Sequence, residues 1–325
     1  MVNVAVAGGL GNVGKTIVEV LHNDKRHNVV AFSRNVCRYV PFIECITEFL
    51  HQVPEISEYT ILAVDYGNVE SLTETLMAHR IHTVISALTI MDDSAGQAQI
   101  NLIRAASQSS TTVRFVASEY GLDAPQNVVE LMPHHKWRAD AIEELRGTSL
   151  EFTRIYNGLF LDYFATPEIK TYQTPLTFAL DIQNKFAAVP GTGNDPVVFN
   201  YTFDIAKYIS AMLTLPKWAE KTNIVSDRMT FNEFISLAEE ARGQKFEVHY
   251  DDIDKLKRFE ITRLPSHVTE HELFPIQMDY VWAVFGRWVA EGHFDLPLEG
   301  SLNQKFPEIK PLTIRAMLDQ FWKGK

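Results

Sequence analysis

The 325-residue sequence has little of several features that define whole classes of protein. Its two cysteines, Cys37 and Cys45, have no CxxC spacing, which excludes a disulfide framework and gives no sign of a thiolate metal site. No apolar run approaches the roughly 18 residues that span a bilayer. The first residues lack a charged segment and a cleavage site, so we expect a cytoplasmic protein.

Positive charge is also scarce. Lys and Arg number 30 against 41 Asp and Glu, which gives a formal net charge of -11. Nucleic acids and anionic membrane surfaces repel such a chain, so we expect neither as a partner. We expect a small-molecule substrate instead and leave open whether the chain forms a homodimer. The 46% of hydrophobic residues can bury a large core.

Short apolar segments alternate with amphipathic ones over the first half of the chain. We expect strands at 2–7, 29–32, 61–64, 82–88, 113–118 and 150–155, and helices at 15–21, around 72–76, at 97–107 and at 135–145. Segment 35–58 has a mixed pattern and stays unassigned. This alternation predicts an α/β fold with a doubly wound parallel sheet, whose ligand crevice lies beyond the carboxyl ends of the strands. Residues 1–155 are therefore expected to form an NAD(P)-binding Rossmann domain.

After residue 156 the alternation loosens. Proline and glycine interrupt short segments, and helices are expected near 204–213, 230–242 and 275–291. We expect residues 156–325 to form a smaller substrate-binding lobe, partly interleaved with the first domain.

A glycine string separates the first expected strand from the first helix. Gly8, Gly11 and Gly14 form G-x-x-G-x-x-G, which allows a sharp turn, close approach of the backbone to a pyrophosphate, and close packing of the helix. The helix N-terminus would add its positive dipole to the phosphates. We expect the loop to bind a dinucleotide with Leu10, Asn12 and Val13. The alternative is a tight turn without a ligand.

The second expected strand ends in Ser33 and Arg34, where sites that prefer NAD often carry an acidic residue. An arginine beside a hydroxyl suits the 2′-phosphate of NADPH, through charge and forked hydrogen bonds. The alternative is a solvated surface arginine. The sequence therefore predicts NADPH as the cofactor.

Longer motifs continue along the chain: RFVASEYGLD at 114–123, a lysine at 136 followed by Arg138, Ile142 and Glu143, TRIYNGLF at 153–160, PGTG at 190–193 and DIA at 204–206. They resemble R-F-x-x-S-E-F-G-x-D, K-x-x-x-R-x-x-I-E, T-x-x-x-N-x-F, P-G-x-G and D-I-A of the isoflavone reductase-like, NmrA-like family. The spacing within the lysine helix is not identical. Asp65-Tyr66 and residues 84–88 are similar to fungal-type members. The resemblance covers most of the chain and is weakest at 35–58 and 245–325.

This resemblance implies an atypical short-chain reductase that uses NADPH, with a lysine as its catalytic or cofactor-positioning group. That lysine falls on Lys136, which could donate a proton where charge develops on a substrate oxygen. The alternative is a helix-start lysine that anchors a ribose or faces solvent. The chain contains no Tyr-x-x-x-Lys, the proton-relay pair of ordinary short-chain dehydrogenases.

Further residues are expected around the same site. The cofactor would also contact Asp65, Tyr66, Ser86, Ala87, Leu88, Ser118, Tyr156 and Asn157. The substrate would contact His135, Phe160, Tyr163 and Phe164. The alternative for the aromatic residues is core packing, and for the histidine a capping or surface position. No metal is expected, although His267 to His271 match H-x-x-E-H, because nothing else supplies a third ligand.

These observations predict a reductase that transfers hydride from NADPH to a small, largely apolar metabolite with aromatic, enone or quinone-like chemistry, of the kind made in fungal specialised metabolism. Two alternatives keep the same fold. One is a redox sensor that binds NADP(H) without catalysis and regulates another protein. The other is a non-redox enzyme such as an isomerase.

Overall fold

The computed structural model describes residues 1–34, 59–125, 127–270 and 278–325. The segment 35–58, with both cysteines, and His271 lie outside the described residues. The chain forms two compact units. The first consists of Met1–Tyr120, Gln126–Ile155 and Ala206–Thr222, and the second of Gly121–Pro125, Tyr156–Ile205 and Asn223–Lys325.

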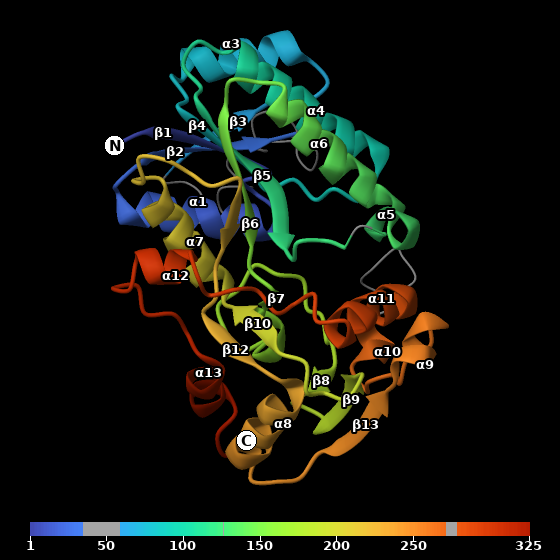
Figure 1. The fold of residues 1–325 in the computed structure, drawn as a ribbon. Helices are drawn as coiled ribbons and strands as arrows, with labels where there is room; N and C mark the ends of the chain where they lie inside the picture. The colour runs from blue at the N-terminus through green and yellow to red at the C-terminus, as the bar shows by residue number, and fades with distance from the viewer. Residues whose placement is uncertain (35–58, 126, 271–277) are drawn as a thin grey trace, which may run out of the picture. The chain divides into compact units, whose positions relative to one another are not determined.

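A sheet of seven strands forms the centre of the first unit, in the order β11-β6-β5-β4-β1-β2-β3 (Figure 1). The strands are β1 (Asn3–Ala7), β2 (Asn28–Ser33), β3 (Thr60–Ala63), β4 (Thr83–Ser86), β5 (Arg114–Gly121), β6 (Glu151–Tyr156) and β11 (Lys221–Asn223). The β1 strand pairs in parallel with β2 and β4, and β2 with β3 and β4 with β5 are parallel too. The strand order reverses between β1 and β4, where doubly wound sheets bind their ligands. The predicted Rossmann-type fold is confirmed.

Amphipathic helices cover both faces of this sheet. The helices are α1 (Asn12–Asp24), α3 (Val69–Ala78), α4 (Asp93–Gln108), the short α5 (Val128–Leu131) and α6 (Lys136–Arg146). Figure 1 shows α3, α4 and α6 side by side on one face and α1 on the other. Their apolar faces bury a core that includes Phe32, Ile103, Phe115 and Leu145, all fully buried. Burial on both faces explains why the strands read as continuous apolar runs.

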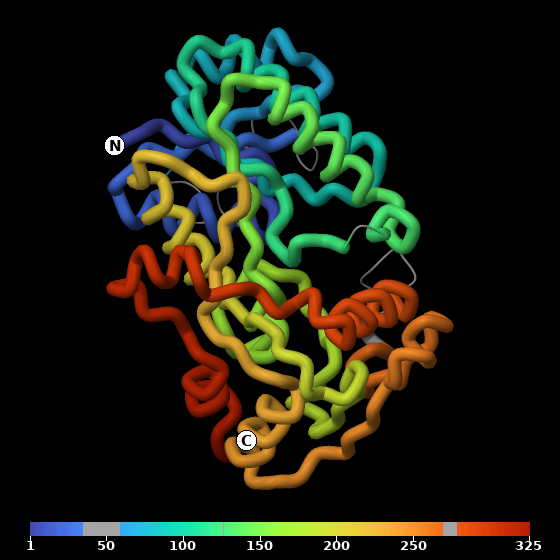
Figure 2. Tube along the Cα trace, in the orientation of Figure 1, coloured from blue at the N-terminus to red at the C-terminus, as the bar shows by residue number. Residues whose placement is uncertain are grey.

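Residues 206–222 return to this unit from the second half of the chain. They include most of α7 (Thr202–Met212) and reach into β11, at one edge of the sheet. Figure 2 shows this yellow segment beside the blue N-terminal part of the unit. The hydroxyl of Ser210 donates to the carboxylate of Asp24 there, at the end of α1. The side chains of Thr153 and Thr222 are hydrogen-bonded at 2.8 Å, which joins β6 to β11.

The second unit contains two three-stranded sheets. One has the order β12-β10-β7, and the other β13-β9-β8. Their strands are β7 (Leu159–Phe160), β8 (Leu180–Asp181), β9 (Phe186–Pro190), β10 (Val197–Asn200), β12 (Asp227–Met229) and β13 (Glu247–Asp251). The helices are α8 (Phe231–Arg242), α9 (Ile253–Lys257), α10 (His267–Glu270), α11 (Met278–Ala290), α12 (Leu302–Lys305) and α13 (Ile314–Phe321). In α11, Trp282 and Trp288 are buried.

Several predicted boundaries are wrong by a few residues. The first helix begins at Asn12 instead of residue 15, and α7 spans Thr202–Met212 instead of 204–213. The β3 strand spans Thr60–Ala63 instead of 61–64. The first turn of a helix carries polar residues that do not follow the apolar periodicity. A helix predicted from periodicity alone therefore begins too late in the sequence.

Candidate functional site

The glycine string forms a tight loop between β1 and α1. Gly8 has a φ of +74°, a conformation that favours glycine. A Cβ on Gly8 would lie 2.7 Å from the carbonyl oxygen of Ala87, and one on Gly14 only 2.1 Å from the carbonyl oxygen of Gly8. A Cβ on Gly11 would lie at 3.3 Å, close to ordinary contact. Close approach of backbone to backbone thus requires glycine at the first and third positions of the motif.

Two hydrogen bonds fix this loop on the sheet. The N–H groups of Gly8 and Gly9 donate to the carbonyl oxygen of Phe32, at 3.1 and 3.2 Å. The loop leads directly into α1 at Asn12, and the first N–H groups of a helix have no helical carbonyl partner. Leu10 and Val13 lie within the same loop and first turn. The arrangement offers backbone donors and a positive helix end to a phosphate.

A pocket of about 640 Å³ opens beside the carboxyl ends of β2 and β3. Arg34 follows β2, and Asp65 and Tyr66 follow β3, so three residues expected to bind the cofactor line one pocket. Ser33, the last residue of β2, is partly exposed next to it. The opposite wall comes from one face of α4, at Ser94, Gln97, Ala98 and Asn101.

Hydrogen bonds hold the loop after β3 in place. The Asp65 carboxylate accepts from the N–H of Gly67 at 2.8 Å. The amide of Asn101 donates to the carbonyl oxygen of Tyr66 at 2.8 Å and accepts from Gln97 at 2.9 Å. The Tyr66 ring is buried in the core, and burial raises the pKa of its hydroxyl. Asp65 and the Tyr66 backbone are thus fixed against the pocket before any ligand arrives.

The ends of β4 and β5 carry the next group of expected residues. Ser86, Leu88 and Ser118 are buried, and Ala87 is half-buried. The Ser118 hydroxyl donates to the carbonyl oxygen of Leu88 at 2.9 Å. The hydroxyl of Tyr120 donates to the carbonyl oxygen of Ser86 at 3.1 Å. These bonds tie the two strand ends together at the edge where the cofactor of a doubly wound sheet crosses.

Lys136 is the first residue of α6 and lies where α6 packs against α4. Its Nζ atom is 3.4 Å from Oδ1 of Asp93, and its side chain is 49% exposed. It also lies 4.9 Å from the centre of the Trp137 ring. The lysine expected to move a proton is therefore in contact with solvent and with a carboxylate at the start of α4.

His135 precedes Lys136 and differs from it in environment. Its ring lies 4.9 Å from that of His134, and the residue is half-buried. Burial, with the nearby charges of Arg138 and His134, lowers the pKa of His135 to about 3. The imidazole is therefore neutral at physiological pH and can act only as a hydrogen-bonding group or an apolar wall.

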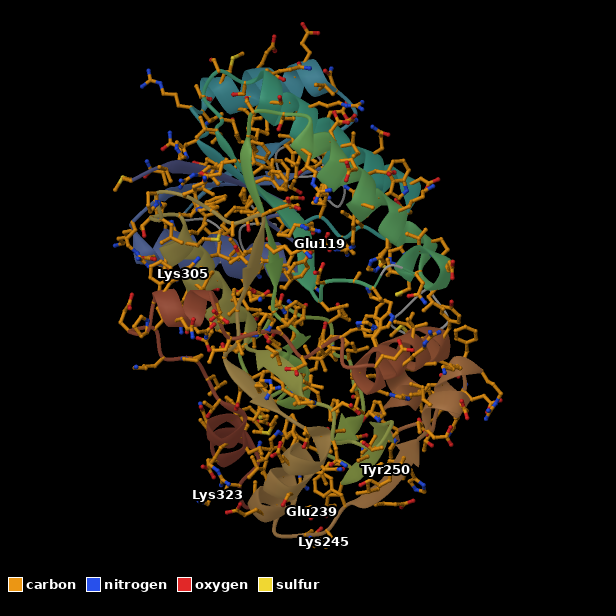
Figure 3. All side chains as sticks on the ribbon, in the orientation of Figure 1. Glu119, Glu239, Lys245, Tyr250, Lys305 and Lys323 are labelled. Atoms are coloured by element: carbon orange, nitrogen blue, oxygen red, sulfur yellow. The ribbon has the colours of Figure 1, made fainter. Side chains whose placement is uncertain are left out.

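Two charged residues near this edge escaped the sequence-based site list. Arg138 donates from Nη1 to the carbonyl oxygens of Ser118, at 2.7 Å, and Glu119, at 3.1 Å, and approaches the Glu119 carboxylate at 3.6 Å. Both side chains are largely buried, and Figure 3 labels Glu119 at the end of β5. Arg138 thus holds the end of β5 in place next to Ser118. The resemblance contained both residues but gave neither a role, since packing against a strand end is not visible in a motif.

In the second unit, Tyr156 and Asn157 are buried at the end of β6. The Tyr156 hydroxyl donates to the carboxylate of Asp123 at 3.0 Å. The N–H of Asn157 donates to the carbonyl oxygen of Gly121 at 2.8 Å. Asn200 donates to the carbonyl oxygen of Asn157 at 2.6 Å. These expected cofactor residues are thus held tightly within the second unit.

The expected substrate-binding aromatic residues fall into two kinds. Phe160 and Tyr163 are partly exposed, and their rings contact each other edge to face at 5.8 Å. Phe164 is buried, with its ring 5.7 Å from that of Phe199 and 5.0 Å from that of Phe234. The core-packing alternative therefore describes Phe164.

Within the described part of the chain, which leaves out the second histidine of the H-x-x-E-H string, no group of three His, Cys, Asp or Glu side chains could hold a metal ion. The first histidine of the string, His267, is buried and stacked on Trp282 with the ring centres 3.7 Å apart. Its Nδ1 atom accepts from the N–H of Leu264 at 3.2 Å. An atom that accepts from the backbone in the core is not free to bind an ion.

Across residues 1–34, 59–125, 127–270 and 278–325, none of the helices has the length and apolar character that a bilayer span requires.

Residues 2–314 match the model of the NmrA-like family. The chain belongs to the NmrA-like family. Oxidoreductase BOA1 of Botryotinia fuckeliana is 31% identical over 317 residues, 96% of each chain. Oxidoreductase swnN of Metarhizium robertsii is 31% identical over 357 aligned residues, covering 100% of this chain and 98% of the relative. Both the predicted family and the predicted enzyme class, an oxidoreductase, are confirmed.

A solved structure, AtPrR2 with NADP+ and (+)pinoresinol, has the same fold, with a TM-score of 0.73 and 18% identity over 98% of each chain. At this identity the likeness concerns the fold alone. It extends over both units of the chain, beyond the Rossmann half that many dinucleotide-binding proteins share.

Proposed function

We propose that this protein is an NADPH-dependent reductase acting on a small, largely apolar metabolite with an aromatic, enone or quinone-like group. The observation that carries the proposal is the pocket lined by Arg34, Asp65 and Tyr66, at the end of the β2 strand to which the glycine loop is hydrogen-bonded. A guanidinium at the end of β2 suits the 2′-phosphate. Asp65 and the Tyr66 backbone suit the amino group and ring nitrogen of an adenine, which need an acceptor and a donor.

The glycine loop fits the remainder of the cofactor. The glycine positions between residues 8 and 14 leave the backbone accessible, and the start of α1 offers N–H groups. Both features suit the pyrophosphate. The tied ends of β4 and β5 would carry the middle of the cofactor toward its nicotinamide end. The oxidoreductase relatives of about the same length, and the NADP+ bound by AtPrR2, support the same assignment.

NADPH, when bound, supplies a hydride to an electrophilic carbon of the substrate. We assign to Lys136 the matching proton, which its ammonium group donates to the substrate oxygen that gains the electron pair. The exposed side chain then regains a proton from water. We assign Phe160, Tyr163 and the neutral His135 to the apolar surface around the substrate.

The first test is a fluorescence titration of the protein and of Arg34→Ala with NADPH and with NADH. We expect NADPH to bind more tightly than NADH, and the variant to lose about 10- to 100-fold in NADPH affinity with little change for NADH, because charged hydrogen bonds to a phosphate are lost. Arg80→Ala, which removes the same charge from an exposed position outside the pocket, is the control. Failure of both dinucleotides to bind would reject the proposal.

The second test screens enones and quinones with the wild type and with Lys136→Ala. We expect turnover in the wild type and a loss of about 100-fold or more in kcat in the variant, with NADPH affinity retained. Tight NADPH binding without turnover of any carbonyl compound would favour a redox sensor instead.

A further inference from the structure

The start of α4 carries a carboxylate that the sequence did not single out. Asp93 is the first residue of α4 and accepts a hydrogen bond from the indole Nε1 of Trp137 at 2.7 Å. The same oxygen atom, Oδ1, lies 3.4 Å from Nζ of Lys136. One carboxylate therefore contacts two consecutive residues at the start of α6.

The indole ring completes this arrangement. Nζ of Lys136 lies 4.9 Å from the centre of the Trp137 ring, within the range of a cation–π contact. The ring is packed against Gly96, where a Cβ would lie 2.2 Å from Cγ of Trp137. Any other residue at position 96 would clash with the ring, so the Trp137 ring packs tightly between α4 and α6. The Lys136 ammonium group is thus held by a charge on one side and by a fixed ring on the other.

This cluster of Asp93, Lys136 and Trp137 borders the cofactor pocket. Ser94, the residue after Asp93, lines that pocket, as do Gln97 and Asn101 on the same face of α4. Asp93 and Gly96 lie on the neighbouring face, toward α6. The cluster therefore lies beside this pocket, at the carboxyl edge of the sheet, where doubly wound folds bind their ligands.

We propose that Asp93 and Trp137 are positioning residues, which hold the ammonium group of Lys136 in place for proton transfer. The proposal rests on the proposed reductase function, and it assigns a role to two residues outside the expected site. An exposed lysine has many rotamers, so fixing it by two contacts from α4 and α6 raises the fraction of time that it is aligned. The Trp137 hydrogen bond keeps the carboxylate from rotating away.

Asp93 is ionised throughout the neutral range. The Trp137 hydrogen bond, and after it the charge of Lys136, lower the pKa of this carboxyl group. Other titratable or charged groups near the starts of α4 and α6, or between the two helices, include Asp92, His134, His135, Arg138, Asp140, Glu143, Arg104 and Glu144. His134 and His135 have lowered pKa values and are neutral at pH 7, mainly through burial. Arg104 and Glu144 neutralise each other by a 2.9 Å ion pair.

The test compares Asp93→Asn, Asp93→Glu and Trp137→Phe with the wild type. We expect Asp93→Asn to lower kcat about tenfold, with KM for the substrate and Kd for NADPH changed less than about twofold, because only the alignment of the proton donor is lost. Asp93→Glu should recover part of kcat, since the charge is restored. Trp137→Phe keeps a ring but loses the hydrogen bond, so a loss of about threefold is expected. Glu74→Gln, which removes an exposed charge on α3, is the control and should match the wild type.

A second readout does not depend on turnover. The indole N–H resonance of Trp137, assigned by its disappearance in Trp137→Phe, reports the bond to Asp93 directly. We expect it to move upfield in Asp93→Asn and to shift when NADPH is added to the wild type.

Three results would overturn the proposal: kcat unchanged or raised in Asp93→Asn, an equal loss of NADPH affinity, or a Trp137 resonance that is indifferent to both Asp93 and NADPH. A wild-type protein that binds NADPH, shifts the resonance and reduces nothing would instead reject the reductase function and leave the cluster as a neighbour of the cofactor.

Discussion

The residues expected to bind ligands have different environments in the two units of the chain. In the first unit, Arg34, Asp65 and Tyr66 come from different strand ends and line one pocket. In the second unit, Tyr156, Asn157 and Phe164 are buried and held by bonds or ring contacts inside that unit. Parallel strands bring all their carboxyl ends to one edge, so residues that follow strands meet whatever their distance in the sequence. Small mixed sheets have no such edge, so a motif there does not reveal which side chains face a ligand.

Among the predicted effects on stability and binding, the largest should come from truncating a buried aromatic residue of the second unit. This truncation tests whether the expected residues there pack in the core or contact the ligand. Phe164→Ala removes a buried ring between Phe199 and Phe234 and should lower the free energy of unfolding by about 3–5 kcal/mol. Phe160→Ala, at a partly exposed position, should cost much less stability and raise KM for the substrate. Urea unfolding and steady-state kinetics measure both. A stable Phe164→Ala protein with a raised KM would return that ring to the substrate site.

The glycine loop allows the matching test in the first unit. In Gly14→Ala the new Cβ would lie 2.1 Å from a backbone oxygen, so the loop must shift. We expect a loss of about 1–3 kcal/mol in stability and a loss of NADPH affinity beyond the range of the titration. Gly147→Ala, at the end of α6 and outside the loop, is the control, since its Cβ would lie 3.4 Å from the nearest carbonyl oxygen and its φ of -77° suits alanine. Equal NADPH affinity in the two variants would show that the loop does not hold the pyrophosphate.

The sequence predicted the first unit well because its signals are local. Apolar strands, the glycine string and residues after β2 and β3 each occupy a few neighbouring positions, and the fold brings them together. The role proposed for Asp93 was not predictable in this way. It lies 43 positions before Lys136, and only the packing of Trp137 on Gly96 brings the two side chains together. The burial of Phe164 likewise depends on Phe199 and Phe234, which are distant in the sequence.

The smallest expected effect concerns His135, next to Lys136. Its pKa is lowered to about 3, first by burial and then by the charges of Arg138 and His134, whereas an unfolded histidine titrates near 6.5. Below about pH 6.5 the unfolded chain therefore takes up a proton that the folded protein does not. Stability should fall as the pH is lowered from about 6.5 toward 3, and this contribution is absent above that range.

His135→Gln cannot take up this proton in either state, so its Tm should fall less than that of the wild type between pH 7 and pH 5, by about 2 °C. His79→Gln, at an exposed position after α3, is the control and should follow the wild type. Differential scanning calorimetry at several pH values measures the difference. If Tm changes with pH in the same way in His135→Gln and in the wild type, the His135 imidazole is as solvated as that of His79. The assignment of His135 to the apolar surface around the substrate would then be wrong.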